Sequence, residues 1–260
     1  MKALATLQKQ LAPTGVLRAA VNLSNPLLIQ SHDPIAGVSP SLAHVIASRL
    51  KVPLKIIPYD HPDQICNAAE QAITSSSNVI RQTPWDIALI AADSDRAKYI
   101  DFTPAYCEIQ ATCMVRKSSP ILSFEDVNKK GISVSVKGGG AYDLWLTRNW
   151  KNAALVRSRT LDLSYDAYIE ENLDVLAGLR PRLLDDLKKC DGHRILDGSF
   201  MSVQQAIGCF KVFNDDNASV SPGFEFLSEF VNEVRQPGNI VQSLIEKHGM
   251  TGRLSLPLLS

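Results

Sequence analysis

Apolar residues along the first part of the chain alternate between strand-like and helix-like spacing. Residues 16–21 alternate as a short strand, and Leu42, Val45, Ile46 and Leu50 share one face of a helix predicted over 39–50. A strand over 54–59, a helix around 68–73 and an almost wholly apolar strand over 85–91 follow. This β-α-β-α-β order predicts a doubly wound sheet.

A second set of alternating elements lies further along the chain. Its predicted elements are a strand over 132–136, the glycines 138–140, a helix over 142–150, a strand over 154–157, a helix over 166–172 capped by Asp162 or Ser164, a strand over 173–178 and a helix over 182–189. Extended segments at 106–117 and 203–211 flank this set, and helices over 224–234 and 240–248 complete the chain.

Two sets of this kind predict an α/β protein with two lobes, each a doubly wound mixed sheet, joined by two hinge crossings. We place lobe 1 at residues 1–108 and 214–260, and lobe 2 at residues 109–213, with a polar loop over 214–223. Ligands of open α/β sheets bind beyond the carboxyl ends of the strands, so we expect a cleft where two such ends face each other.

Composition excludes several classes of function. The chain has 27 Lys plus Arg against 27 Asp plus Glu, so its formal net charge of zero predicts no nucleic-acid partner. Its five cysteines are scattered without a CxxC pair, and its five histidines are isolated. We therefore predict no metal and no cofactor, and no G-x-S-x-G or P-loop motif indicates otherwise.

The N-terminus has helical rather than secretory character. Leu4, Leu7 and Leu11 recur at helical spacing with polar residues between them, and no continuous apolar core follows. No run approaches the roughly 20 apolar residues that span a membrane. We expect no membrane insertion and a cytoplasmic protein as the sequence stands, or a periplasmic or extracellular one if a leader has been removed.

Four phrases resemble the family 3, amino-acid-type solute-binding proteins of ABC transporters. They are the opening strand at 13–22, the helix entry at 37–43, the segment 85–106 with Asp95-Arg96-Ala97-Lys98 and Asp101-Phe102-Thr103-Pro104, and residues 203–208 with the tail 241–249. The phrases N-x-x-N-P, G-x-A-Y-D-L and Q-Q-A-x-G are similar to a leaderless, uncharacterised branch. The resemblance implies the type II periplasmic-binding-protein fold, a Venus-flytrap clamp with a central hinge.

The resemblance assigns a role to Arg96. In the family, the arginine of the corresponding E-R phrase grips the ligand's carboxylate, and a planar guanidinium suits two parallel hydrogen bonds. Asp93 stands just before it, while Ala91 and Ala92 occupy places where family members carry a Ser or Thr side chain. Backbone N–H groups of that loop are the alternative donors.

In the second lobe, Gly139 and Gly140 open a helix that begins near Tyr142. Exposed amides and the helix dipole favour an anion at such a turn, and the alternative is a tight turn that requires positive φ. Tyr142 is a further candidate to reach the cleft.

The expected ammonium partner is absent from the strand over 173–178. Leu179 takes the place of the family's acidic residue, and Arg180 follows it. Glu108 in the first crossing is a substitute partner for an amine, or an ordinary exposed carboxylate. Arg180 is a candidate for a second anionic group of the ligand.

The remaining candidates end the first strand and flank the second crossing. The amides and hydroxyl of Asn22, Ser24 and Asn25 either read a polar ligand or form an Asx turn before Pro26. Gln204 and Gln205 follow each other on a strand, so one points inward and the other to solvent.

Two functions lead from the sequence, ahead of a third, which is a cytosolic sensor or a domain that serves a partner protein. The first is a solute-binding protein that closes around a small carboxylate, with an ABC permease as partner. The second is an enzyme on the same scaffold, such as a cyclohexadienyl dehydratase-like lyase, in which Glu108 or Asp93 supplies general acid catalysis.

Overall fold

The chain divides into two compact units, which are described separately. The computed structural model describes residues 2–75, 83–211 and 221–258. Unit 1 comprises residues 1–108 and 204–260, and unit 2 comprises residues 109–203. The chain passes between the units within strands β7 (Cys107–Arg116) and β12 (Met201–Phe210). The second passage precedes the boundary predicted after residue 213, because residues from Gln205 onward already pair with a strand of unit 1.

Unit 1 is built on a mixed sheet. Its strands are β1 (Leu17–Asn22), β4 (Leu54–Tyr59), β5 (Ile87–Ala91), β6 (Ile100–Phe102) and the latter part of β12. The order is β4-β1-β5-β12, with β6 on β12. Strand β1 is parallel to both β4 and β5, while β12 is antiparallel to β5. Every residue of β5 is buried, as its apolar run predicts.

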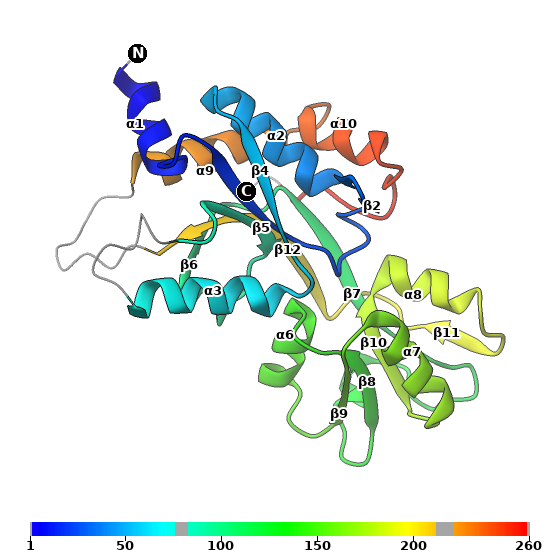
Figure 1. Cartoon of the computed structure of the whole chain (residues 1–260). Helices are drawn as coiled ribbons and strands as arrows, with labels where there is room; N and C mark the ends of the chain where they lie inside the picture. The colour runs from blue at the N-terminus through cyan, green and yellow to red at the C-terminus, as the bar shows by residue number, and fades with distance from the viewer. Residues whose placement is uncertain (1, 76–82, 212–220, 259–260) are drawn as a thin grey trace. The chain divides into compact units, whose positions relative to one another are not determined.

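Helices pack around this sheet and against one another (Figure 1). They are α1 (Lys2–Leu11), α2 (Val38–Leu50), α3 (Pro62–Ser75), α9 (Pro222–Val234) and α10 (Ile240–Lys247). Helices α2 and α3 contact β1 and β4, while α1 contacts α9 and α10 contacts α2. A short hairpin of β2 (Ser31–His32) and β3 (Ile35–Ala36) and the 3-10 turn η1 (Arg96–Lys98) complete the unit; the sequence pattern was too short to predict them.

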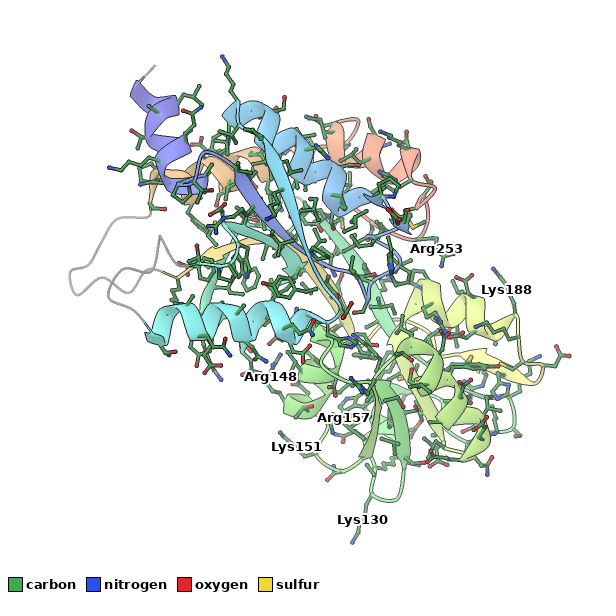
Figure 2. All side chains as sticks on the ribbon, viewed as in Figure 1. Lys130, Arg148, Lys151, Arg157, Lys188 and Arg253 are labelled. Atoms are coloured by element: carbon green, nitrogen blue, oxygen red, sulfur yellow. The ribbon has the colours of Figure 1, made fainter. Side chains whose placement is uncertain are left out.

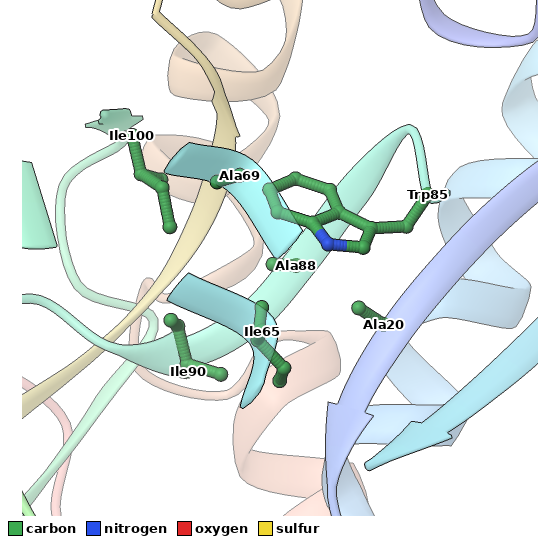
Figure 3. Packing of buried hydrophobic residues seen from close by; sticks show 7 residues of the cluster. All are labelled: Ala20, Ile65, Ala69, Trp85, Ala88, Ile90 and Ile100. Carbon is green, nitrogen blue, oxygen red and sulfur yellow. The ribbon is translucent and has the colours of Figure 1, made fainter. Parts of the chain in front are cut away.

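The core of unit 1 gathers around Trp85 (Figure 3). This indole is fully buried and stacks on Phe210, with ring centroids 3.9 Å apart. Ile65 and Ala69 of α3 approach the ring, so the apolar face of α3 closes over the sheet. Burying side chains of this size stabilises the fold by about 1.5–3 kcal/mol each. The packing therefore holds α3 against the sheet of unit 1.

Unit 2 is a smaller mixed sheet with helices. Its elements are the latter part of β7, α5 (Phe124–Val127), β8 (Ser133–Lys137), α6 (Ala141–Asn149), β9 (Ala154–Ser158), α7 (Leu161–Glu170), β10 (Val175–Leu179), α8 (Arg180–Leu187), β11 (His193–Ile195) and the first residues of β12. The order is β7-β10-β8-β9, with β11 on β7. Strand β10 is parallel to β8 and antiparallel to β7. Helix α7 packs on β8, β9 and β10, and Tyr168 of this helix is fully buried in the core.

The start of α7 corrects the sequence analysis. The helix begins at Leu161 rather than near 166, and its N-cap is Thr160, whose hydroxyl accepts from the Leu163 N–H at 3.1 Å. The two predicted caps are engaged elsewhere. Asp162 pairs with Arg182, and the buried Ser164 donates back to the Leu161 carbonyl. Thr160 is the cap because it directly precedes the first helical residue, whereas Asp162 and Ser164 already lie inside the helix.

The polar loop predicted over 214–223 lies largely outside the described residues, since residues 212–220 are not described. Within the part of the chain that the structure describes, no helix combines the length and the apolar character needed to cross a membrane.

Candidate carboxylate site

Arg96 begins the 3-10 turn that follows the carboxyl end of β5. The turn forms because the Asp93 carboxylate accepts the Asp95 N–H at 2.9 Å and the Asp93 carbonyl accepts the Ala97 N–H at 2.9 Å. The Arg96 side chain folds back, and its Nη1 donates to the Ala91 carbonyl at 2.7 Å. Only 4% of Arg96 is exposed, so the guanidinium is held against the end of the strand.

The electrostatic environment of Arg96 is unusual for an arginine. Burial lowers the pKa of Arg96, while the nearby Cys66, Asp93 and Asp63 act in the opposite direction. The guanidinium nevertheless stays charged, because arginine does not deprotonate in proteins. A buried cation with a planar fork of five N–H donors is suited to bind a carboxylate through two hydrogen bonds, in addition to the Ala91 carbonyl.

Asn22, Ser24 and Asn25 lie at the same edge of the sheet as the Arg96 turn. Strands β1 and β5 are parallel, with Val21 opposite Leu89, so their carboxyl ends coincide. The Asn22 Oδ1 accepts from the Ser24 N–H at 3.1 Å and from the Ser24 hydroxyl at 2.8 Å, and the Asn25 Oδ1 accepts from the Leu27 N–H at 3.1 Å. The Asx-turn alternative is therefore present at both asparagines.

Glu108 and Gln204 also reach this edge, although they lie far apart in sequence. The Gln204 carbonyl accepts the Ala92 N–H at 2.8 Å, which places Gln204 beside the Arg96 turn. The Gln204 Nε2 donates to the Glu108 carboxylate, and the Glu108 backbone pairs with Ser255. Gln205 is 2% exposed while Gln204 is half-buried, so the two side chains differ as strand alternation predicts. Unit 1 thus gathers Arg96, Asn22, Glu108 and Gln204 along one sheet edge.

In unit 2, the carboxyl ends of β8 and β10 meet in the same way. Val136 lies opposite Ala177 in a parallel pair, so the glycine turn at 138–140 and Leu179 with Arg180 occupy neighbouring positions. Leu179 is buried at the end of β10. The carboxyl end of β10 is therefore apolar at Leu179.

The glycine turn already holds an anion from the protein itself. Gly139 has φ +75°, and its N–H donates to the Asp143 carboxylate at 2.9 Å. The other oxygen of Asp143 accepts from Arg157 Nε at 3.0 Å, and Asp143 is almost fully buried. Asp143 is not among the residues predicted from the sequence, although an acidic residue in the first turn of a helix is the usual signal for this contact. The Gly139 N–H is thus engaged within the protein.

Tyr142 and Arg180 present polar atoms that the described residues do not satisfy. Tyr142 is 4% exposed, and its buried hydroxyl has no hydrogen-bond partner among the described residues. A Cβ on Gly140 would lie 3.1 Å from the Tyr142 ring, so this glycine makes room for the aromatic side chain. Arg180 donates from Nη2 to the Gly198 carbonyl, while its buried Nε has no partner in the described part of the chain. Buried donors of this kind usually have a partner in the functional state.

Comparison with known proteins identifies the fold. No protein-family model matches the chain, and no curated protein matches it in sequence. The fold is that of the type II periplasmic binding proteins, the two-lobed class that includes the amino-acid-binding components of ABC transporters. The fold predicted from the resemblance to family 3 is therefore confirmed.

Three solved structures illustrate the likeness. A binding component of an ABC transporter from Wolinella succinogenes, complexed with lysine, has a TM-score of 0.68 at 17% identity and covers 90% of this chain and 95% of its own. The arginine-bound substrate-binding protein AbpA from Streptococcus pneumoniae has a TM-score of 0.68 at 18% identity, covering 94% and 98%. The ancestral amino acid-binding protein AncCDT-1, a precursor of cyclohexadienyl dehydratase, has a TM-score of 0.67 at 19% identity, covering 94% and 99%.

Proposed function

We infer that this protein is a solute-binding protein that takes a small carboxylate-bearing ligand without a free α-amine, such as a keto, hydroxy or cyclic acid. Arg96 in unit 1 grips the ligand's carboxylate. In unit 2, the groups at the carboxyl ends of β8 and β10 are further candidates to contact the ligand.

The observation that carries the proposal is the buried Arg96 guanidinium at the end of β5, on a fold whose neighbours include a lysine-bound and an arginine-bound protein. A dry guanidinium binds a carboxylate more strongly than a solvated one, because water no longer competes for its donors. The hydrogen bond to the Ala91 carbonyl fixes one end of the fork and so orients the rest.

The absence of an acid at Leu179 supports the choice of ligand class. An ammonium group buried against Leu179 would lack a partner, and an unpaired buried charge is costly. Glu108 is the candidate that would restore an amine contact. The Gln204 amide already donates to its carboxylate, so the proposal does not depend on it. If Arg180 turns toward the ligand, its unsatisfied Nε favours a second anionic group and therefore a diacid.

Transport is the proposed setting of this binding. A loaded protein of this fold would deliver its ligand to an ABC permease, and the groups described above require no metal or cofactor for that task. The dehydratase alternative would use Asp93 or Glu108 as an acid. The carboxylates of both accept hydrogen bonds within unit 1, so we base the proposal on binding.

A thermal-shift panel tests the ligand class directly. Common α-amino acids are compared with keto, hydroxy and dicarboxylic acids of the same carbon skeleton at equal concentration. A ligand at about 100 times its Kd stabilises the folded state by about 2.7 kcal/mol, which raises the melting temperature by several degrees. We expect strong shifts with amine-free acids and weak ones with their amino counterparts.

The reverse pattern would contradict the proposal. Strong shifts with ordinary amino acids alone would show that another group replaces the missing acid at Leu179. If neither set produced a shift, a small carboxylate ligand would be excluded, and a larger substrate and the enzyme alternative would be favoured.

A further inference from the structure

Four aromatic side chains of unit 2 surround a pocket that none of the groups above uses. The pocket has a volume of about 420 Å³ and is lined by Phe124, Glu125, Asn128, Trp145, Asn149, Trp150, Ser199 and Phe200. This volume lies in the range of small-molecule sites. The aromatic residues come from α5, α6 with its C-cap and the segment before β12, so three separate parts of the unit converge there.

Phe200 is the centre of the aromatic cluster. Its ring centroid lies 5.3 Å from those of Trp145 and Trp150 and 5.9 Å from that of Phe124. The Phe200 N–H donates to the Ala111 carbonyl at 3.0 Å, which ties the backbone at Phe200 to β7. These rings are separate from the apolar core of the unit around Met114 and Tyr168. The four aromatic rings therefore lie together and line one pocket.

The charge of the pocket indicates what that ligand is. Of the described residues that line it, Glu125 is the charged one, and its exposed carboxylate has neither a hydrogen bond nor an ion pair within the described part of the chain. Two neighbouring lysines are engaged elsewhere. The Lys129 ammonium pairs with Asp126 at 2.6 Å, and that of Lys151 donates to the Thr147 carbonyl at 2.7 Å. Lys130 and Lys151 extend outward from the unit (Figure 2).

We propose that the aromatic pocket of unit 2 is a second binding site, which takes a small organic cation with an alkylated nitrogen, such as a quaternary ammonium ion. The ring faces of Trp145, Trp150 and Phe200 carry partial negative charge that attracts a soft cation. Glu125 adds a full negative charge at the mouth of the pocket. The methyl groups of such a cation also bury apolar surface against the rings.

Choline and 3,3-dimethylbutan-1-ol are the matched probes. They have the same shape, but only choline carries a charge, and neither carries a carboxylate for Arg96. Each is titrated into the full chain at constant ionic strength while tryptophan fluorescence is recorded. Two of the three tryptophans line the pocket, and the third, Trp85, is buried in the core of unit 1 and provides a constant background.

We expect a saturable fluorescence change with choline and binding of the neutral alcohol at least about fivefold weaker. Glu125→Gln should weaken choline binding about threefold to tenfold, because the carboxylate contribution is lost. Glu170→Gln removes an exposed carboxylate at the end of α7 and is the matched control, which should bind choline as the wild type does. Trp145→Leu should abolish the response.

Several outcomes would overturn the proposal. Equal binding of choline and the alcohol would leave an apolar pocket without preference for a cation. No response to choline, or unchanged binding by Glu125→Gln, would remove the site. Far-UV circular dichroism checks that Trp145→Leu folds, and if it does not, the comparison of Glu125→Gln with Glu170→Gln decides.

Discussion

At the scale of single residues, the role of each candidate side chain depends on its burial and on the partners that packing gives it. Arg96 was singled out by its phrase, and it is buried at the end of β5. Asp143 was overlooked although it holds the Gly139 amide, because a carboxylate that serves the backbone looks like a solvated one in a sequence. The unsatisfied Tyr142 hydroxyl and Arg180 Nε could not be predicted either, since their burial depends on packing.

Burial of the His248 ring makes stability depend on pH. The Ser41 hydroxyl lies 2.9 Å from His248 Nε2 and ties α2 to the end of α10. Burial, with a smaller effect of Lys247, lowers the pKa of His248 below its ordinary value of 6.5. The unfolded chain therefore binds a proton more readily than the folded one, so stability is complete above about pH 6.5 and is lost as the pH falls below it. Solvent screening of this partly exposed ring keeps the effect below about 1 kcal/mol.

Urea denaturation at about pH 7.5 and about pH 5.5 checks this dependence. We expect His248→Gln to lose less stability on acidification than the wild type does. His44→Gln changes an exposed histidine on α2 and should behave as the wild type. Equal acid sensitivity in His248→Gln and the wild type would show that His248 does not contribute.

At the scale of elements, strong periodicity predicted the elements well and weak periodicity did not. The strand predicted over 54–59 is β4 (Leu54–Tyr59), and the helix predicted over 240–248 ends one residue earlier as α10. Strands β2, β3, β6 and β11 are too short to show alternation. They form because neighbouring strands supply hydrogen-bond partners. The start of α7 was predicted too far along the chain, because Thr160 caps the helix before its apolar pattern begins.

The glycine turn between β8 and α6 provides a matched test of backbone strain. Gly139 has φ +75° with no atom near its missing side chain, while Gly138 would place a Cβ in ordinary contact at 3.6 Å from Arg157. Gly139→Ala should therefore cost about 1–2 kcal/mol through left-handed strain alone. Gly138→Ala should stay within about 0.5 kcal/mol of the wild type. Chemical denaturation of both variants measures the difference, and equal stabilities would mean that the turn relaxes to accept alanine.

At the scale of the whole molecule, the candidate ligand-binding groups are local features of each unit and do not reflect an overall charge. Its net charge is zero, and the candidate groups gather at the carboxyl end of a sheet within each unit. The order of elements along the sequence was enough to predict this fold class, because β-α-β units place loop residues at one edge of a parallel sheet. The order of elements does not predict the ligand, because the ligand depends on a few contacts such as those of Arg96 and Leu179.

Calorimetric titration of the Arg96→Ala variant tests the central claim most directly. The titrant is the acid that gives the largest thermal shift, and Arg159→Ala, which removes an exposed arginine of unit 2, is the control. Wild type and control should bind one equivalent with equal affinity, while Arg96→Ala should lose about 2–4 kcal/mol because the buried carboxylate loses its partner. Arg96→Lys keeps the charge without the bidentate geometry and should lie between them. Unchanged affinity in a folded Arg96→Ala variant would contradict the account, because the ligand's carboxylate would then be bound elsewhere.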